Sequence, residues 1–162
     1  MNDTATIHVI ERYDGPARAL WEIVQAWKDE ADKGFGLVLD VEHFMGHLGA
    51  WIDGPDSDLL VWRQPSGFIM GFMGIQVFAS PLSGEIVIEE HMWYTLPQYR
   101  SMASARAFID AAEAWGRERG ARQFLLTSSF LANIQADRVM RMYGRLGFKP
   151  FETVFIRPIG GS

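Results

Sequence analysis

One stretch decides the fold: residues 95–105, Thr95-Leu96-Pro97-Gln98-Tyr99-Arg100-Ser101-Met102-Ala103-Ser104-Ala105. A strand is predicted to end at Thr95, and a turn led by Pro97 follows. A helix is then predicted to open on an arginine and a run of small residues. The N-terminus of a helix has unpaired backbone N–H groups and a partial positive charge, and small side chains let an anion approach them. The stretch therefore predicts a cradle for a pyrophosphate.

The remaining sequence predicts strands and helices in the order β-α-α-β-β-β-α-β-α-β. The predicted strands cover residues 4–13, 59–63, 68–79, 85–95, 124–127 and 151–157. The predicted helices begin near Pro16 and cover residues 40–51, 102–119 and about 132–146. With no linker or repeat in 162 residues, we expect a single domain over residues 1–162. The expected class is α/β (α+β), with one mixed central sheet of six or seven strands and about four flanking helices.

Composition narrows the class of protein further. The chain has no cysteine, which excludes disulfides, thiolate zinc sites and cysteine nucleophiles and fits a reducing cytoplasm. The first residues, 1–4, lack the basic and apolar regions of a signal peptide. No apolar run approaches the ~18 residues of a membrane span. We therefore expect a cytoplasmic protein without a membrane partner.

Charge is distributed unevenly along the chain. Residues 1–96 carry 5 basic and 15 acidic side chains, whereas residues 97–162 carry 10 basic and 5 acidic ones. A site at the junction of the two halves would suit a polyanionic cofactor and a cationic substrate; the alternative is a chance distribution. The net charge of −5 argues against a nucleic-acid partner.

Three motifs, in this order and spacing, resemble the GNAT family of acetyl-coenzyme A-dependent N-acetyltransferases, and the chain as a whole is similar to its small bacterial or phage-type members. The first is the stretch 96–105 after a predicted strand. The second is the end of a helix, residues 113–121, before a short strand. The third is Tyr143-Gly144-Arg145-Leu146-Gly147-Phe148, which is similar to the family's Tyr-x-x-x-Gly-Phe ending.

The resemblance implies a GNAT-like fold and assigns acetyl-CoA as the acyl donor. Its pyrophosphate would bind the backbone N–H groups of Arg100, Ser101, Met102, Ala103, Ser104 and Ala105. Its pantetheine arm would pair beside Trp93, Tyr94 and Thr95, where the sheet splays. In such a fold the predicted strands 85–95 and 124–127 are parallel neighbours that diverge at their C-terminal ends. The acceptor would be a primary amine of a small molecule or a protein.

Two carboxylates lie on the otherwise apolar predicted strand 85–95. Strict alternation puts Glu90 on the face of Met92 and Tyr94, and Glu89 on the other face. Apolar surroundings raise the pKa of a carboxyl group, which suits removal of a proton from an ammonium. Glu90 is the first candidate for the catalytic base and Glu89 the second, because a β-bulge would exchange their faces. A carboxylate that only faces solvent or pairs with an arginine is the alternative.

Tyr143 lies on the apolar stripe of its predicted helix. The resemblance implies that its phenol protonates the departing thiolate. The alternative is a core tyrosine whose hydroxyl is satisfied by a neighbour.

His43 and His47 stand four residues apart, so one helical face can hold both. The pair lacks the glutamate of an HExxH motif, and no third ligand is evident, so we predict no metal site.

A second function of a different class stays open. Alanine stands at position 103, where the family usually has glycine, and at position 105, where the family has glycine or alanine. The extra methyl group at Ala103 narrows the approach of a ligand to the backbone. The chain would then be a catalytically weak or inactive GNAT-like module in a larger assembly, for example a phage particle, and would be associated with the virion. A homodimer or an assembly partner is compatible with both functions.

Overall fold

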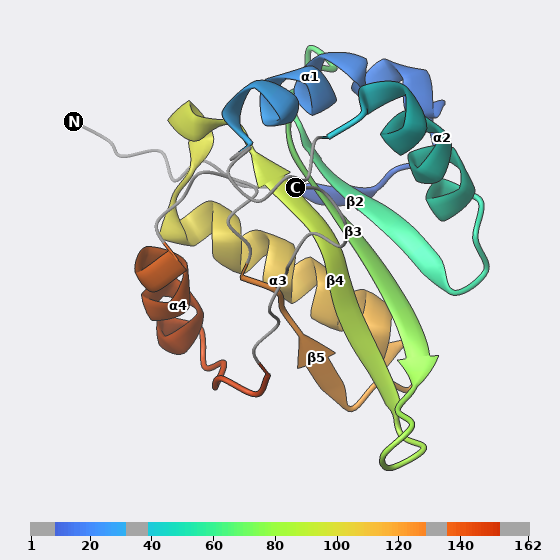
Figure 1. Ribbon diagram of the computed structural model, residues 1–162, viewed down its shortest axis with the longest axis vertical. Coiled ribbons are helices and arrows are strands. Elements are labelled where there is room, and N and C mark those ends of the chain that lie inside the picture. Colours follow the sequence, from blue (N-terminus) through green and yellow to red (C-terminus); the bar gives the residue numbers. More distant parts are fainter. Residues whose placement is uncertain (1–8, 32–38, 129–135, 153–162) are drawn as a thin grey trace, which may run out of the picture.

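The structure, a computed structural model, describes residues 9–31, 39–128 and 136–152. In these residues, one five-stranded sheet has the strand order β1-β2-β3-β4-β5 (Figure 1). The strands are β1 (Ile10–Arg12), β2 (Ser57–Arg63), β3 (Ile69–Ala79), β4 (Ile86–Thr95) and β5 (Gln123–Leu125). The α-helices are α1 (Trp21–Glu30), α2 (Val41–Ile52), α3 (Met102–Arg117) and α4 (Ala136–Arg145), with short 3-10 helices η1 (Ala17–Leu20) and η2 (Pro97–Tyr99). Neighbouring strands are antiparallel except β4 and β5, which are parallel.

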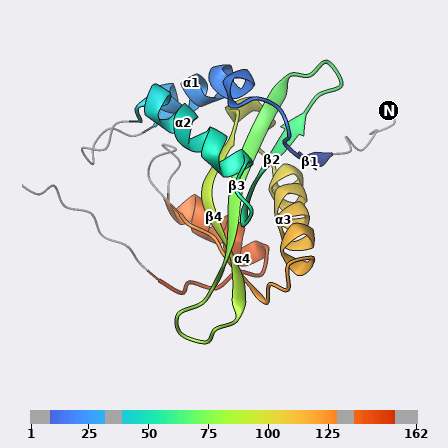
Figure 2. The same cartoon turned by 90° about the vertical axis from the view of Figure 1, so that its right-hand side faces the viewer.

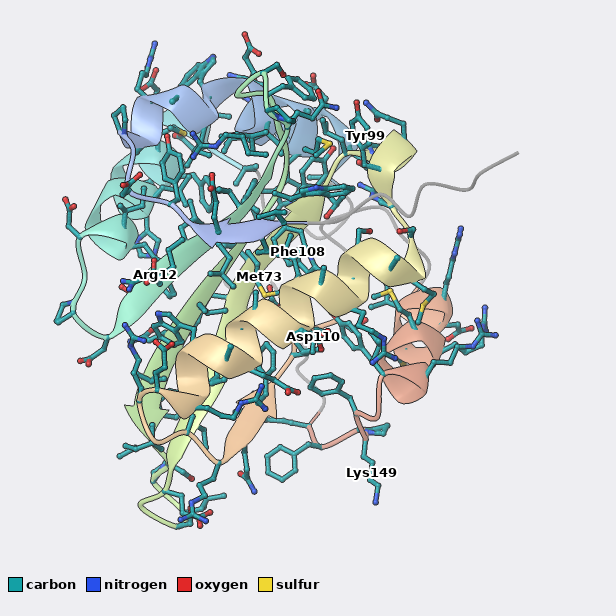
Figure 3. All side chains as sticks on the ribbon, turned by 180° about the vertical axis from the view of Figure 1, so that it is seen from behind. Arg12, Met73, Tyr99, Phe108, Asp110 and Lys149 are labelled. Atoms are coloured by element: carbon teal, nitrogen blue, oxygen red, sulfur yellow. The ribbon has the colours of Figure 1, made fainter. Side chains whose placement is uncertain are left out.

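Helices cover the sheet on both faces. Figure 2 shows α1 and α2 on one face and α3 on the other. The core is accordingly divided into two clusters. The cluster under α1 and α2 includes Leu20, Val24, Trp27, Leu48, Phe72 and Tyr94. The cluster under α3 includes Met73, Ile75, Ile88, Phe108, Ala112 and Trp115, and Figure 3 shows Phe108 and Met73 between helix and sheet. The long strands are therefore apolar on both faces, as a sheet covered on both sides requires.

Helix α3 packs very closely against β4. A Cβ atom at Gly116 would overlap Cδ1 of Ile88, so any larger residue would force that side chain to move. The helix ends in a turn in which Gly120 has φ +77°, a conformation that favours glycine. The amide of Ala121 donates to the carbonyl of Gly116 at 3.0 Å and closes the turn. This geometry confirms the helix end predicted at Gly120.

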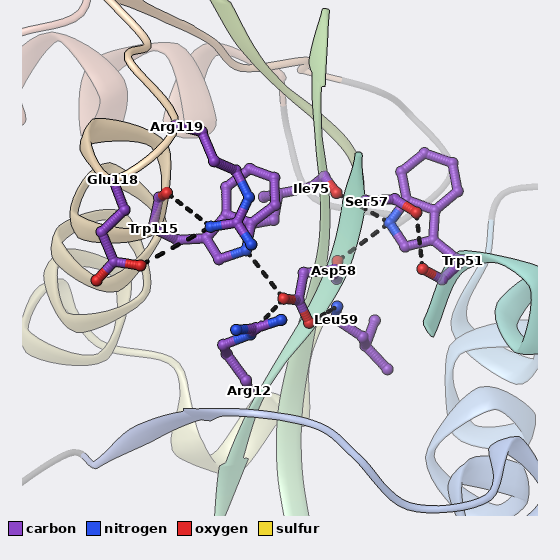
Figure 4. A network of polar contacts seen from close by, with 9 residues as sticks. All are labelled: Arg12, Trp51, Ser57, Asp58, Leu59, Ile75, Trp115, Glu118 and Arg119. Carbon is purple, nitrogen blue, oxygen red and sulfur yellow. Dashed lines mark hydrogen bonds and ion pairs between the residues drawn. The ribbon is translucent and has the colours of Figure 1, made fainter. Parts of the chain in front are cut away.

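A buried carboxylate ties the layers together at the first residues of β2 (Figure 4). Asp58 is 3% exposed and accepts hydrogen bonds from Nε of Arg12 and, at 2.9 Å, from Nε1 of Trp115 on α3. Its other oxygen accepts from the amide of Leu59 at 3.0 Å. From the opposite face, Nε1 of Trp51 on α2 donates to the carbonyl of Asp58 at 3.1 Å. One residue thus connects both helical layers to the sheet.

The predicted fold class is confirmed. The described sheet has five strands where six or seven were expected, but residues 4–8 and 153–157 of two expected strands lie outside the described ranges. The same holds for residues 132–135 of the last expected helix, whose described part is α4. No helix among the described residues is long and apolar enough to span a membrane.

Candidate active site

The candidate site begins where β4 and β5 part. Their parallel pairing runs only from Val87 opposite Gln123 to Glu89 opposite Leu125, although β4 continues to Thr95. Beyond this point, Oε2 of Glu90 accepts a hydrogen bond from the amide of Thr127 at 3.1 Å. We call this region the splay. The expected divergence of two parallel strands is confirmed, and a carboxylate side chain takes the place of backbone pairing at its start.

A β-bulge in β4 sets which side chains face which layer. Gly74 of β3 lies opposite Met92 and Ile75 lies opposite Glu90, so His91 is the additional residue. Tyr94 consequently packs in the cluster under α1 and α2, and Trp93 packs with the cluster under α3. The prediction that Glu90 shares a face with Met92 and Tyr94 is wrong, because strict alternation does not continue through a bulge.

Glu90 is buried at the start of the splay, with 5% of its surface exposed. Burial raises the pKa of Glu90 to about 7, and the neighbouring charge of Glu89 adds to the rise. The amide of Thr127 opposes it by donating to the carboxylate. Only Oε2 takes part in a hydrogen bond among the described residues, so Oε1 can accept a proton. This carboxyl group changes its charge near neutral pH.

Glu89 pairs with the bulged residue His91. Its Oε2 is 3.1 Å from Nε2 of His91, and both side chains are about one-third exposed. The His91 ring contacts the indole of Trp51, with centroids 4.7 Å apart. On α2, the His47 ring lies 5.7 Å from the same indole. Glu89 is thus paired with His91 near α2, whereas Glu90 is hydrogen-bonded to the amide of Thr127. The two adjacent carboxylates therefore have different neighbours.

Tyr143 of α4 contacts the same residue, Thr127, as Glu90 does. Its hydroxyl donates to the carbonyl of Thr127 at 3.0 Å. Its ring stacks on Trp93 with an interplanar angle of 10° and centroids 6.4 Å apart. Burial, followed by the charge of Glu90, raises the pKa of the Tyr143 phenol well above its usual value. The phenol therefore stays protonated and keeps a proton that it can donate.

In the part of the chain that the structure describes, the edge of β4 beyond the bulge has backbone groups without a strand partner. The amide of Leu96 donates to the carbonyl of Met70 in β3. Because backbone groups along a strand point alternately to its two sides, the N–H and C=O groups of Trp93 and Thr95 point away from β3. The paired part of β5 ends before these residues. The Tyr94 side chain points elsewhere, because its hydroxyl donates to Glu30 at 2.9 Å. The carbonyl of Thr95 accepts from Nε of Arg100 at 2.7 Å. The groups that an extended ligand could pair with here are therefore the N–H and C=O of Trp93 and the N–H of Thr95.

The N-terminus of α3 is capped by its own side chains. Oγ of Ser101 accepts from the amide of Ser104, and Oγ of Ser104 accepts from the amide of Ser101, both at 3.0 Å. The amide of Ala105 donates to the carbonyl of Ser101. Within the described residues, the amides of Met102 and Ala103 have no hydrogen-bond partner, and both side chains are exposed. Two of the six amides expected to bind a pyrophosphate are thus free.

The side chain of Arg100 is directed away from these free amides. Its guanidinium forms an ion pair with Glu30, the last residue of α1, at 2.7 Å. Sequence reasoning missed Glu30, because the two residues are 70 positions apart and no local pattern connects them.

The histidines of α2 do not form a metal site in the described structure. The amide of His43 donates to the N-cap side chain of Asp40, a bond that begins the helix. In the ranges that the structure covers, no group of three or more metal-ligating side chains comes together.

Comparison with known proteins agrees with this architecture. The family model described as the acetyltransferase (GNAT) family matches residues 7–148. No curated protein sequence matches the chain.

Solved structures share the fold at low sequence identity. The ribosomal-protein-alanine N-acetyltransferase of Brucella melitensis biovar Abortus 2308 superposes with a TM-score of 0.70 at 16% identity, over 94% of this chain and 99% of its own. AAC(6')-Iy, in complex with the bisubstrate analogue CoA-S-monomethyl-acetylneamine, gives 0.68 at 15% identity, over 96% and 100%. An acetyltransferase of Trypanosoma brucei gives 0.67 at 17% identity, over 93% and 100%. With the family model matching most of the sequence, the chain belongs to the acetyltransferase (GNAT) family.

Proposed function

We propose that this protein is an N-acetyltransferase that moves the acetyl group of acetyl-CoA to a primary amine. The observation that carries the proposal is the splay, where the β4 edge at Trp93 and Thr95 has no strand partner among the described residues and which lies between a buried carboxyl group and a protonated phenol. Family membership supplies the reaction class.

The described residues fit acetyl-CoA in two respects. The exposed edge of β4 offers N–H and C=O groups to the amide-containing pantetheine arm. The free amides of Met102 and Ala103, at the positive end of a 16-residue helix, offer donors to the pyrophosphate. When bound, acetyl-CoA supplies an activated thioester. Trp93, Thr95, Met102 and Ala103 are the residues that would hold it, and we retain Arg100, Ser101, Ser104, Ala105 and Tyr94 as residues that shape the same segment.

Glu90 and Tyr143 would move the protons of the reaction. Glu90, with a pKa of about 7, can accept a proton from the ammonium of the acceptor at physiological pH, directly or through a water molecule. Tyr143 can donate its phenol proton to the sulfur of the leaving group if its hydroxyl turns from the carbonyl of Thr127. Glu89, paired with His91, is the second candidate for the base.

The acidic side chains of the protein favour a positively charged amine as the acceptor. Residues 1–96, which include α1, α2 and β4, carry a net excess of acidic side chains and would attract a cation. One structural neighbour is named a ribosomal-protein-alanine N-acetyltransferase, and another is in complex with the bisubstrate analogue CoA-S-monomethyl-acetylneamine. A useful panel therefore contains an aminoglycoside, a polyamine and a peptide with an N-terminal alanine.

The experiment is calorimetric titration of the purified protein with acetyl-CoA, followed by thiol release with this panel. We expect binding and turnover of at least one amine. Absence of heat and of a thermal shift at millimolar acetyl-CoA would contradict the proposal.

One observation favours the second candidate function, a binding or structural module without activity. The capping box occupies the amides of Ser101 and Ser104, which leaves fewer donors for a pyrophosphate. A protein that binds acetyl-CoA normally and turns over no amine would support that candidate.

A further inference from the structure

We infer that Glu30 is a positioning residue for the pyrophosphate-binding segment, which it holds in place through Arg100. The segment is residues 100–105, and the inference rests on the proposed function. Glu30 ends α1, so the contact connects a helix on the α1–α2 face of the sheet with the residues that would bind the cofactor.

The contact between the two side chains is a two-point clamp. NH1 of Arg100 donates to Oε1 of Glu30 and NH2 donates to Oε2, both at 2.7 Å. This parallel arrangement is the most directional ion pair that proteins form. The third donor, Nε, bonds to the carbonyl of Thr95 at 2.7 Å. The guanidinium thus joins α1 to the end of β4, and three of its five N–H donors are used within the protein.

Tyr94 fixes the carboxylate from a third direction. Its hydroxyl donates to Oε2 of Glu30 at 2.9 Å, and its ring lies 5.3 Å from the guanidinium carbon of Arg100. Burial raises the pKa of Glu30, but the hydrogen bonds from Arg100 and Tyr94 outweigh it and lower the pKa overall. The side chains of Arg100 and Glu30 are only 27% and 20% exposed, so solvent screens the pair incompletely. The clamp is therefore charged and partly shielded at neutral pH.

The clamp determines where α3 begins. Arg100 has an extended backbone and is followed directly by the N-cap residue Ser101. The free amides of Met102 and Ala103 come next, so any rotation at Arg100 changes where they point. Holding Arg100 in one position pre-organises these donors and lowers the entropy cost of binding an anion. Arg100 then acts by fixing the backbone before α3, and the carboxylate of Glu30 neutralises the charge of the Arg100 guanidinium.

The test uses two acetyl donors that differ in the pyrophosphate. Acetyl-CoA has one, whereas S-acetylpantetheine carries the same thioester without it. We expect Glu30→Gln to weaken acetyl-CoA binding about tenfold by calorimetry. The KM for S-acetylpantetheine and its kcat should change less than twofold. A purely structural role would affect both donors alike.

Two further variants keep the test interpretable. Glu113→Gln removes an exposed ion pair with Arg117 on α3, 3.2 Å long, and should change neither donor. Tyr94→Phe removes one hydrogen bond to Glu30 and leaves the ion pair, so it should weaken acetyl-CoA binding about threefold. If Glu30→Gln does not fold, Tyr94→Phe serves as the test in its place.

Equal or tighter acetyl-CoA binding by both Glu30→Gln and Tyr94→Phe would overturn the inference and leave the proposed function intact. Parallel losses with both donors would also overturn it. A wild-type protein that binds no acetyl-CoA would instead refute the proposed function, and the inference with it.

Discussion

The carboxylate of Glu90 and the amide of Thr127 are hydrogen-bonded at 3.1 Å, across the point where β4 and β5 part. The carbonyl of the same residue, Thr127, accepts from the hydroxyl of Tyr143 at 3.0 Å. The proposed base and the proposed acid therefore meet on the backbone of one residue. The charge of Glu90 also adds to the rise in the pKa of the Tyr143 phenol.

The first prediction concerns stability and pH. The pKa of Glu90 is about 7 in the folded chain and near 4.5 in the unfolded one, so the folded state binds the extra proton between these values. The stabilisation is complete below pH 4.5 and is lost as pH rises through 7, on the order of 3 kcal/mol in total. Glu90→Gln keeps a hydrogen-bond acceptor for Thr127 and removes the titration. Urea unfolding at pH 5 and pH 8 should show the variant gaining stability relative to the wild type at the higher pH. A constant difference between the two proteins at both values would contradict the assigned pKa.

The second prediction concerns the rate at different pH values. If Glu90 is the base, kcat/KM of the wild type rises as pH approaches 7 and levels above it, because only the carboxylate accepts a proton. Glu90→Gln should lose roughly 10²–10⁴-fold, and high pH should restore part of the loss because more amine is then neutral. Glu89→Gln is the matched control one residue away. A large loss in that variant, with Glu90→Gln near wild type, would transfer the role to the Glu89–His91 pair.

The third prediction concerns Tyr143. Tyr143→Phe keeps the ring stacked on Trp93 and removes the hydroxyl bonded to Thr127. We expect a loss roughly 10-fold in kcat, smaller than that of Glu90→Gln, since a thiolate leaves readily, and no recovery at high pH. Because both residues bond to Thr127, the double variant should deviate from additivity. Additive losses in a pH–rate study of the three variants would show that the residues act independently.

The sequence predicted those parts of the fold that depend on local pattern. The order of elements, the helix opening at Met102 and its end at Gly120 follow from alternation, capping and glycine geometry within short windows. The parallel pairing of β4 with β5 followed from the family resemblance.

The details of the site depended on contacts that a local pattern does not contain. The bulge at His91 is a register shift between β3 and β4 at Gly74 and Ile75, and the sequence offered a bulge only as an alternative to strict alternation. The Glu30–Arg100 clamp and the Asp58 network join segments 70 and 57 residues apart. Such contacts depend on how the layers are placed, so sequence reasoning proposed Glu90 and Tyr143 as site residues but singled out neither Glu30 nor Asp58.

The fourth prediction concerns Asp58. Asp58→Asn leaves one acceptor oxygen where two are used, so either the buried indole N–H of Trp115 or the amide of Leu59 loses its partner. We expect a loss of about 1–3 kcal/mol in unfolding free energy. Arg12 is 62% exposed, so Arg12→Gln should cost less than about 1 kcal/mol. If urea unfolding showed equal losses of unfolding free energy for the two variants, the buried donors would not depend on Asp58 more than the exposed arginine does.

The last prediction separates cofactor binding from helix stability at Ala103. This residue is exposed, and its amide is one of the two free donors at the start of α3. An acidic side chain here favours the helix dipole, so Ala103→Glu should keep or raise the thermal midpoint. The same charge repels a pyrophosphate, so acetyl-CoA affinity should fall by roughly tenfold or more. Ser104→Glu would be a poorer test, because Ser104 is 3% exposed and belongs to the capping box.

Ala103→Gly is the matched variant for this position. It removes a methyl group beside the free amides and should keep or improve affinity, although the helix loses up to about 1 kcal/mol because glycine is a weak helix former. The two substitutions should thus move affinity and stability in opposite directions. Calorimetry with acetyl-CoA and thermal unfolding of the same samples measure both quantities. If affinity followed stability in the two variants, the pyrophosphate would not bind at the start of α3, and the placement of the cofactor would be wrong.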